Sequence, residues 1–349
     1  MSRELLEHLI SGQDLNQDQA ADLLRSLASG EVEPSAAGAL LIALRIKGEA
    51  AAEIRGFALA MRELATHPEL PPGRAYVDIV GTGGDDSGSL NLSTGSALLA
   101  AASGLEVVKH GNRSISSRSG SADVLAALGL PIPLDERAAA RCLEDTGFSF
   151  LFAPHYHPAM KHIAPVRQAL GVRTVFNVLG PLVNPAEPPF HVIGAASEPL
   201  ARLMAETIAE MPIERAFVIH GAAGWDEATP IGPFVCFDVT GREVVREVRD
   251  PGTFGLSPCS EADLAGGEPD ENAERLLKAL RGHDTAAHRD ALVLGAALAL
   301  EVTGAQADFA GAIERARQAI DDGSAATLLD RLDAFSAAEK TAAAPPGPD

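Results

Sequence analysis

Residues 78–129 read DIVGTGGDDSGSLNLSTGSALLAAASGLEVVKHGNRSISSRSGSADVLAALG, and the rest of the chain is interpreted around this stretch. It contains two loops rich in glycine and hydroxyl residues, Gly81–Thr94 and His110–Ser121. Each loop follows a short apolar run, Tyr76–Val80 or Val107–Val108, and precedes a helical pattern rich in alanine and leucine. A strand, a loop and a helix in this order present backbone N–H groups and a helix N-terminus to an anion. The stretch therefore predicts a site for a phosphorylated sugar.

The chain from residue 76 onward alternates between strand-like and helical patterns. The strand-like runs are Tyr76–Val80, Glu106–Val108, Phe148–Phe152, His191–Gly194 and Ala216–His220, and the helical patterns are Ser96–Ser103, Ala122–Leu128, Asp135–Thr146, Pro158–Leu170 and Pro199–Met211. This alternation predicts an α/β fold with a mainly parallel sheet flanked by helices. Residues Phe234–Val248 predict an antiparallel hairpin that turns near Thr240–Gly241. Ligands of such sheets bind at the carboxyl ends of the strands, where both loops are expected.

Three further regions define the expected domain organisation. Residues 1–70 show only helical spacing and predict a smaller all-helical domain, joined by helices from about residues 160–185. Residues 74–335 form the expected α/β domain. The tail 336–349, SAAEKTAAAPPGPD, is expected to be disordered.

The composition excludes several classes of protein. The net charge of −20 argues against nucleic acid as a partner. No apolar run reaches the roughly 20 residues that span a membrane, and the start MSRELLEHLI lacks the layout of a signal peptide. Three distant cysteines indicate neither a disulfide framework nor a zinc cluster. We therefore expect a soluble cytoplasmic protein.

The first loop carries the residue types that a phosphate site needs. Gly81, Gly83 and Gly84 allow close approach of the backbone, and Asn91, Ser93 and Thr94 follow at the start of the next helix. The loop is neither a P-loop nor the spaced GxGxxG of a dinucleotide site. The pair Asp85–Asp86 could suggest the acidic loop of the common phosphoribosyltransferase fold, but here the pair follows the glycines and lacks the rest of that pattern.

The second loop adds positive charge. Between Ser103 and Ala122 the only acid is Glu106, against Lys109, Arg113 and Arg118. Lys109 suits a phosphate as a compact charge, and the serines after it offer hydroxyl donors. This cluster indicates an anion site within an acidic protein.

Two further segments carry candidate functional groups. Asp226 and Glu227 follow the run Ala216–His220, where a carboxylate pair would hold Mg²⁺, although such a pair is also common on solvated surfaces. Arg167 could pair with a substrate carboxylate. The two histidines of Pro154–Pro158 have no acidic or cysteine partner nearby in the sequence, so zinc is not expected.

Together these motifs closely resemble the anthranilate phosphoribosyltransferase family over nearly the whole chain, to about Phe335. The matching pieces, in order, are GTGGD, the N-x-S-T ending at Thr94, KHGNR, SGSADVL, RxxLGxRTxFNxLGPLxNP and the Asp226–Glu227 pair. The resemblance implies transfer of phosphoribosyl from phosphoribosyl pyrophosphate (PRPP) to the amino group of anthranilate, in tryptophan biosynthesis. It also implies Mg²⁺, two per subunit, and a homodimer in which a helical domain is hinged to the α/β domain.

The resemblance also implies a set of site residues. The substrate-binding positions are Gly81, Gly84, Asp85, Ser89, Asn91, Leu92, Ser93, Thr94, Lys109, His110, Gly111, Asn112, Arg113, Ser114, Ile115, Ser116, Ser117, Ser121, His157 and Arg167. The metal positions are Ser93, Asp226 and Glu227, and the catalytic positions are Lys109, Asn112 and Arg167. Because the aryl amine of anthranilate is a poor base, we expect catalysis by positioning and charge stabilisation rather than by a general base.

Several positions depart from the family pattern, Asp86, Leu90 and Trp225 among them, and two alternatives stay open. Asp86 stands where the family usually has glycine, Leu90 replaces an aromatic residue, and Trp225 replaces a leucine. One alternative is a pyrimidine nucleoside phosphorylase of similar fold, although its lysine-histidine-serine-threonine-glycine-glycine signature is missing here. The other is a nucleic-acid-binding relative without transferase activity.

Overall fold

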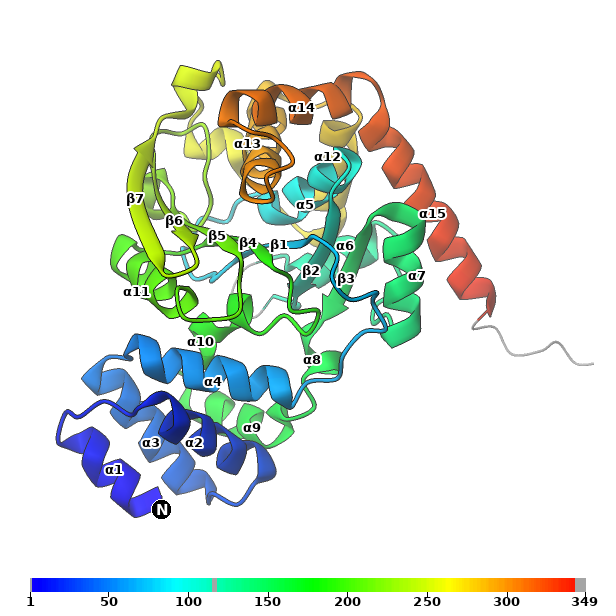
Figure 1. The fold of residues 1–349 in the computed structure, drawn as a ribbon. Helices are drawn as coiled ribbons and strands as arrows, with labels where there is room; N and C mark the ends of the chain where they lie inside the picture. Colours follow the sequence, from blue (N-terminus) through cyan, green and yellow to red (C-terminus); the bar gives the residue numbers. More distant parts are fainter. Residues whose placement is uncertain (1, 115–117, 343–349) are drawn as a thin grey trace, which may run out of the picture.

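The computed structural model describes residues 2–114 and 118–342 (Figure 1). The chain begins with four helices that pack together below the rest of the molecule in this view. They are α1 (Ser2–Ile10), α2 (Gln17–Ser29), α3 (Pro34–Lys47) and α4 (Ala51–Glu63). The later helix α9 (Met160–Leu170) packs against α2 and α3 and so belongs to the same bundle in space. A capping box at Asn16 starts α2, and Gly30 in the left-handed conformation ends it.

A seven-stranded sheet lies at the centre of the remaining chain, in the order β3-β2-β1-β4-β5-β6-β7. The strands are β1 (Tyr76–Gly81), β2 (Glu106–Gly111), β3 (Phe148–Phe152), β4 (Phe190–Gly194), β5 (Arg215–His220), β6 (Phe234–Thr240) and β7 (Glu243–Arg249). The first five strands are parallel, and β6 and β7 form the expected antiparallel hairpin. The predicted α/β fold with a mainly parallel sheet is therefore confirmed.

Helices cover both faces of the sheet (Figure 1). One face packs against α5 (Leu92–Ala102), α6 (Ser121–Ala127), α7 (Glu136–Thr146), α12 (Pro269–Leu280), α13 (Ala286–Val302), α14 (Phe309–Asp321) and α15 (Ser324–Ala342). The other face packs against α11 (Glu198–Ile208) and, beyond it, the N-terminal bundle. Along β5, Phe217 and Ile219 enter the first core while Ala216 and Val218 enter the second, because successive side chains of a strand point to opposite faces.

Short helical segments connect these elements. They are α8 (Ala153–Tyr156), α10 (Phe176–Leu179), η1 (Gly180–Leu182), η2 (Ala222–Gly224), η3 (Pro251–Phe254) and η4 (Glu261–Leu264). No helix in the described ranges is long and apolar enough to cross a membrane.

The expected disordered tail is wrong for residues 336–342, because α15 continues to Ala342. Phe335 and Ser336 are buried where α15 packs against the body of the protein. Arg141 on α7 forms an ion pair of 2.7 Å with Glu339 and so attaches the end of the helix. Residues 343–349 lie outside the described ranges. These residues extend the helix that Phe335 and Ser336 anchor in the protein, and alanine has a high helix propensity.

Candidate active site

The carboxyl ends of β1, β2, β4 and β5 meet at one edge of the sheet, and both loops begin there. The segment after β5 brings Asp226 against β1, so closely that a Cβ on Gly81 would lie 2.3 Å from Asp226 Oδ2. Only glycine permits this approach. The fold therefore places Asp226 beside the first loop, although the two positions are 145 residues apart in the chain, from 81 to 226.

Two carboxylates bind directly to backbone N–H groups of the first loop and of α5. Asp226 Oδ2 accepts a hydrogen bond of 2.6 Å from Gly83 N. Glu227 Oε1 accepts one of 2.9 Å from Ser93 N, and its Oε2 accepts one of 3.3 Å from the Ser89 hydroxyl. Asp85 joins them, since its Oδ2 accepts from Asp226 N at 3.3 Å. Three acids thus lie together where the first loop enters α5.

The electrostatics of these acids suit a divalent cation. Burial raises the pKa of Asp226, and the neighbouring Asp85 raises it further. Burial likewise raises the pKa of Glu227, with Asp226 as the next cause. In the described ranges, no group of three or more His, Cys, Asp or Glu side chains is placed so that it could hold a metal ion by itself. Mg²⁺ needs no such cage, because it commonly takes one or two carboxylates and completes its shell with substrate phosphates and water. The oxygen atoms of Ser93, Asp226 and Glu227 therefore have the chemistry that Mg²⁺ prefers.

Lys109 brings a positive charge to the same place from β2. Its side chain is buried, and Nζ donates hydrogen bonds to Ile79 O and, at 3.3 Å, to the Ser93 hydroxyl. Burial lowers the pKa of Lys109, while the carboxylates of Asp78, Glu227 and Asp226 oppose that shift. Lys109 thus lies within the electrostatic reach of the acids that were predicted to hold metal.

Asn91 ties the two loops together. Its Nδ2 donates to Ser119 O at 3.0 Å, and its Oδ1 accepts from Asn272 Nδ2 at 2.9 Å. The side chains of Leu92 and Thr94 are buried at the start of α5. Asn272 belongs to α12 and was not among the predicted site residues, because nothing in the local sequence links it to residue 91.

The second loop is held by a carboxylate that the sequence did not single out. Asp123 Oδ2 accepts hydrogen bonds of 3.0 Å from both Ser114 N and Gly120 N, and Asp123 forms an ion pair of 2.9 Å with Arg113. Asn112 O accepts from the Ser121 hydroxyl at 3.3 Å. The loop thus closes on the start of α6. The predicted positions Ile115, Ser116 and Ser117 lie outside the described residues.

Two histidines lie behind the second loop. His110 and His157 approach through their Nε2 atoms at 3.2 Å, and His110 Nδ1 lies 3.2 Å from Gly180 O. Burial lowers the pKa of His110 to about 3 and that of His157 to about 4. Both rings are therefore neutral at pH 7 and interact with their surroundings through hydrogen bonds rather than charge.

Arg167 lies on α9, with its guanidinium 5.4 Å from the centre of the Phe176 ring. Burial lowers the pKa of this guanidinium, which stays charged all the same because arginine is a very weak acid. In the described part of the chain, no hydrogen bond or ion pair joins Arg167 to Asn112 or His157. The structure thus gathers the predicted phosphate and metal residues in one contact network and leaves Arg167 apart from them.

Three of the departures from the family pattern have different environments. Asp86 is exposed and adopts a positive φ of 53°, a conformation that glycine takes without strain and that aspartate tolerates. Its carboxylate therefore faces solvent. Leu90 and Trp225 are buried in the core cluster on the α5 side of the sheet. Both side chains fill the core.

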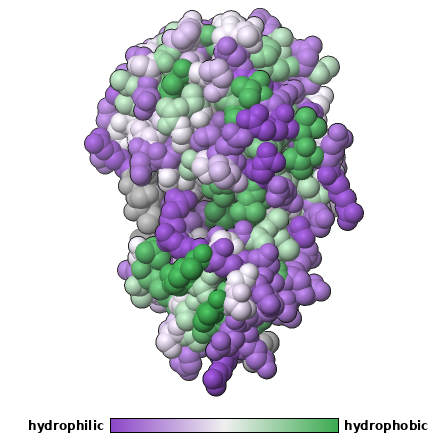
Figure 2. All heavy atoms as spheres, turned by 90° about the vertical axis from the view of Figure 1, so that its left-hand side faces the viewer, coloured by the Kyte–Doolittle hydropathy of each residue, from purple (hydrophilic) through white to green (hydrophobic). Residues whose placement is uncertain are grey.

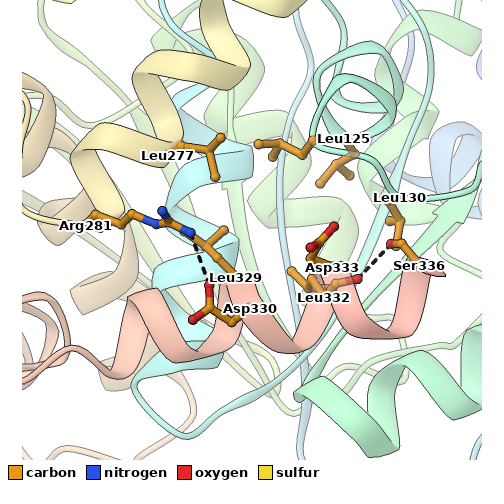
Figure 3. Close-up of a pocket in the computed structure, with 10 residues that line it drawn as sticks. Leu125, Leu130, Leu277, Arg281, Leu329, Asp330, Leu332, Asp333 and Ser336 are labelled. Atoms are coloured by element: carbon orange, nitrogen blue, oxygen red, sulfur yellow. Dashed lines mark hydrogen bonds and ion pairs between the residues drawn. The ribbon is translucent and has the colours of Figure 1, made fainter. Parts of the chain in front are cut away.

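A cavity elsewhere in the molecule is separate from this site. It measures about 180 Å³ and lies between α6, α12 and α15, with leucines around it and the Arg281–Asp330 ion pair at its rim (Figure 3). None of the predicted site residues lines it.

The chain matches known proteins along nearly its full length. Residues 73–326 match the glycosyl transferase family, a/b domain, and residues 3–65 match the helical bundle domain of that family. It is 45% identical over 331 residues to an anthranilate phosphoribosyltransferase of Methylobacterium nodulans, covering 95% of this chain and 97% of the relative. It is 41% identical to that of Thermomicrobium roseum, covering 99% of this chain and 100% of the relative.

Solved structures agree with this match. The anthranilate phosphoribosyltransferase from Thermus thermophilus has a TM-score of 0.89 at 41% identity, and the alignment covers 95% of this chain and 99% of that one. The enzyme from Saccharomyces cerevisiae, solved in complex with PRPP and Mg, has a TM-score of 0.87 at 27% identity, covering 97% of this chain and 98% of that one.

Proposed function

This chain belongs to the anthranilate phosphoribosyltransferase family of glycosyl transferases, and on that premise we propose how its residues perform the reaction. The reaction transfers 5-phosphoribosyl from PRPP to the amino group of anthranilate and releases pyrophosphate, a step of tryptophan biosynthesis. We assign the reaction to this site because Asp226 accepts a hydrogen bond from Gly83 N and Glu227 accepts one from Ser93 N. These hydrogen bonds join the acidic pair to the glycine-rich first loop, at the carboxyl ends of the parallel strands, where ligands of such sheets bind.

The donor substrate is expected to lie along the first loop. The dipole of α5, whose N-terminus follows the first loop, and the Lys109 ammonium supply the positive side of the site. The PRPP-binding residues that we propose are Gly81, Gly84, Asp85, Ser89, Asn91, Leu92, Ser93, Thr94, Lys109, His110, Gly111, Asn112, Arg113, Ser114, Ile115, Ser116, Ser117 and Ser121. The hydrogen bond from Asn91 to Ser119 O supports a shared site, because it holds the two loops side by side.

Asp226, Glu227 and Ser93 are the residues that would hold Mg²⁺, and we propose two ions per subunit. Bound Mg²⁺ supplies positive charge that offsets the charge of the departing pyrophosphate. Support comes from the clustering of Asp85 with the two acids, since three neighbouring carboxylates repel one another unless a cation or a proton compensates them. Lys109 adds a fixed positive charge beside Ser93.

The acceptor is expected on the side of Asn112, His157 and Arg167. We propose that Arg167 binds the anthranilate carboxylate, because a guanidinium without a carboxylate partner has its donors free for one. Burial lowers the pKa of His157 to about 4, which makes it a weak base, so we propose that it serves as a hydrogen-bonding group rather than as a general base. Positioning of the amine against C1 of the ribose, together with stabilisation of charge on the leaving group, then accounts for the rate.

The homodimer that the family resemblance implies has a suitable face on the N-terminal bundle. Figure 2 shows hydrophobic side chains reaching the surface on the lower part of the molecule, which is built from the N-terminal helices. Ile10 is 66% exposed and Ile46 is 82% exposed, and the groove beside Ile42 runs between α3 and α9. We propose that a second copy covers this face, and we place the protein in the cytoplasm.

The dimer proposal is tested by light scattering after size exclusion. Ile42→Glu combined with Ile46→Glu should convert the dimer to a monomer, because burying these charges at an interface is costly. Val248→Glu is the matched control, since Val248 is 58% exposed on β7 and far from this face in the fold. If the Ile42→Glu, Ile46→Glu variant stays dimeric and the Val248→Glu variant becomes monomeric, the interface lies at the β7 edge of the sheet instead.

The activity itself is tested by the loss of anthranilate fluorescence. We expect a loss that requires both PRPP and Mg²⁺ and that stops when a chelator is added. Adenine- and thymine-type acceptors serve as controls and should give no product. Turnover of a pyrimidine acceptor without anthranilate turnover would favour the nucleoside phosphorylase alternative, and salt-dependent DNA binding without turnover would favour the nucleic-acid-binding one.

A further inference from the structure

Arg173 lies directly over the first loop, although the residue itself belongs to the segment between α9 and α10. Its Nη2 donates to Gly83 O at 3.4 Å. A Cβ on Gly84 would lie 1.6 Å from Arg173 Nη1 and 2.7 Å from its Cζ. The guanidinium therefore fills the space that any side chain at residue 84 would need.

The guanidinium of Arg173 has no ion-pair partner among the described residues. Asp85, Asp86, Asp226 and Glu227 all lie in or beside this loop, yet none of them forms an ion pair with Arg173, and no other described residue does. A guanidinium has five N–H donors, and the weak bond to Gly83 O uses one of them. An exposed arginine with free donors beside a phosphate-type loop is a suitable partner for an anion.

The backbone of Arg173 is held from the N-terminal bundle. Arg45 Nη1 on α3 donates to Arg173 O at 2.6 Å. Gly171 ends α9 in the left-handed conformation, with its N–H bonded to Arg167 O. Arg167 and Arg173 thus lie on one short segment. Arg167 is on the side where we propose the acceptor, and Arg173 contacts the glycine-rich loop Gly81–Thr94.

We propose that Arg173 is a further substrate-binding residue, whose guanidinium pairs with a pyrophosphate oxygen of PRPP while it covers Gly83 and Gly84. This proposal rests on the proposed function for the nature of the anion. Gly83 then has both backbone groups engaged: its N–H with Asp226 and its C=O with Arg173. Through Arg45 and the end of α9, the N-terminal bundle supplies one side of the donor site.

The test measures PRPP binding by calorimetry, with Mg²⁺ present and absent, for the intact protein and for Arg173→Gln. Glutamine can still donate to Gly83 O but carries no charge. We expect PRPP affinity to fall by about tenfold or more, because a charge-assisted hydrogen bond is lost. The KM for PRPP should rise by the same factor, while kcat at saturating PRPP stays within about twofold, since the contact exists before and during the reaction.

Salt dependence separates a charge contact from a purely structural one. PRPP affinity of the intact protein should weaken more steeply with added salt than that of Arg173→Gln, because one screened attraction has been removed. The matched control is Arg281→Gln, which removes the same charge at the rim of the distant cavity and should leave the affinity unchanged.

Either of two results would overturn the proposal: unchanged PRPP affinity in Arg173→Gln, or a lower kcat with unchanged PRPP affinity and unchanged salt slope. The second result would mean that Arg173 only shapes the loop. A failure of the proposed function is distinct from both, because it would show as PRPP binding by the intact protein without any turnover of anthranilate.

Discussion

At the scale of single residues, the candidate site depends on side chains that reach backbone groups far away in the sequence. Asp226 binds Gly83 N, Glu227 binds Ser93 N, and Asn91 binds Ser119 O. Each bond satisfies a loop N–H or carbonyl that would otherwise face solvent, and together they fix the loops before a ligand arrives. Catalysis by positioning requires this kind of preorganisation.

Replacing the acids with amides should separate activity from stability. In the double variant Asp226→Asn with Glu227→Gln, an oxygen remains to accept from Gly83 N and Ser93 N, but the charge that we propose binds Mg²⁺ is gone. We expect kcat to fall by about two orders of magnitude or more. The melting temperature in the presence of a chelator should stay the same or rise, because the repulsion with Asp85 is relieved. An undiminished rate would refute the metal assignment.

Gly84 should show energetic coupling to Arg173. Gly84→Ala introduces a side chain at a φ of +78° and into the space of the guanidinium, so we expect weaker PRPP binding. Adding Arg173→Ala removes the steric part of that cost, and the two effects should then be non-additive by about 0.5–3 kcal/mol. A double-mutant cycle on PRPP affinity measures this coupling, and strict additivity would mean that the two residues do not touch in solution.

At the scale of elements, the position of the first loop depends on how closely α5 packs against α13. A Cβ on Gly95 would lie 2.5 Å from Leu292 Cδ2, and one on Gly295 would lie 2.2 Å from the Ser96 hydroxyl. The two glycines leave room for the Leu292 and Ser96 side chains of the opposite helix, so the two helices pack closely. Since Ser93 and Thr94 begin α5, this contact sets the depth at which they face the site.

Gly295→Val should therefore destabilise the fold. An isopropyl group here overlaps Ser96 and forces the helices apart, which should lower the free energy of unfolding by about 1–3 kcal/mol. Gly180→Ala is a suitable comparison, because Gly180 has helical torsions and no atom within 4 Å of an added Cβ. Chemical denaturation of both variants measures the difference. Equal stability of the two variants would contradict the close packing of α5 and α13.

At the scale of the whole molecule, buried neutral histidines link the fold to pH. Burial lowers the pKa of His191 to about 3, as it does for His110, and the pKa of His157 to about 4. These rings lie between the sheet and the segments that lead to the N-terminal bundle. In the unfolded chain they would titrate near pH 6.5, so below that value the unfolded state binds more protons than the folded one.

The free energy of unfolding should consequently stay constant above pH 6.5, as far as these histidines are concerned, and decrease as the pH falls below 6.5. Each of the three histidines should reduce the free energy of unfolding by about 1.4 kcal/mol per pH unit in this window. Urea unfolding between pH 7.5 and 5 measures the slope. His191→Gln should make the slope shallower, whereas His283→Gln, at an exposed position, should not change it. A slope that is the same in His191→Gln as in the original protein would mean that His191 is already charged in the fold.

Much of the fold follows from local patterns. Each strand-like run from Tyr76 to His220 became a strand of the sheet, and the hairpin turns near Thr240 as expected. Periodicity and turn residues act over a few positions, so they are readable without knowledge of the rest of the chain. The exception is residues 336–342, whose composition suggests disorder but whose helix is stabilised by α7 through Arg141.

The candidate site likewise has residues that the sequence predicts and residues that only the structure reveals. The sequence alone determined the two glycine loops, Lys109 and the Asp226–Glu227 pair, because their residue types and order carry the chemistry of a phosphate and metal site. Only the tertiary structure decided two of the groups that support them: Asn272 behind Asn91, and Arg173 over Gly84. The reason is physical. A hydrogen bond or close contact between residues 90 or 180 positions apart depends on where the sheet and the helices place their backbones, and no local pattern encodes that distance.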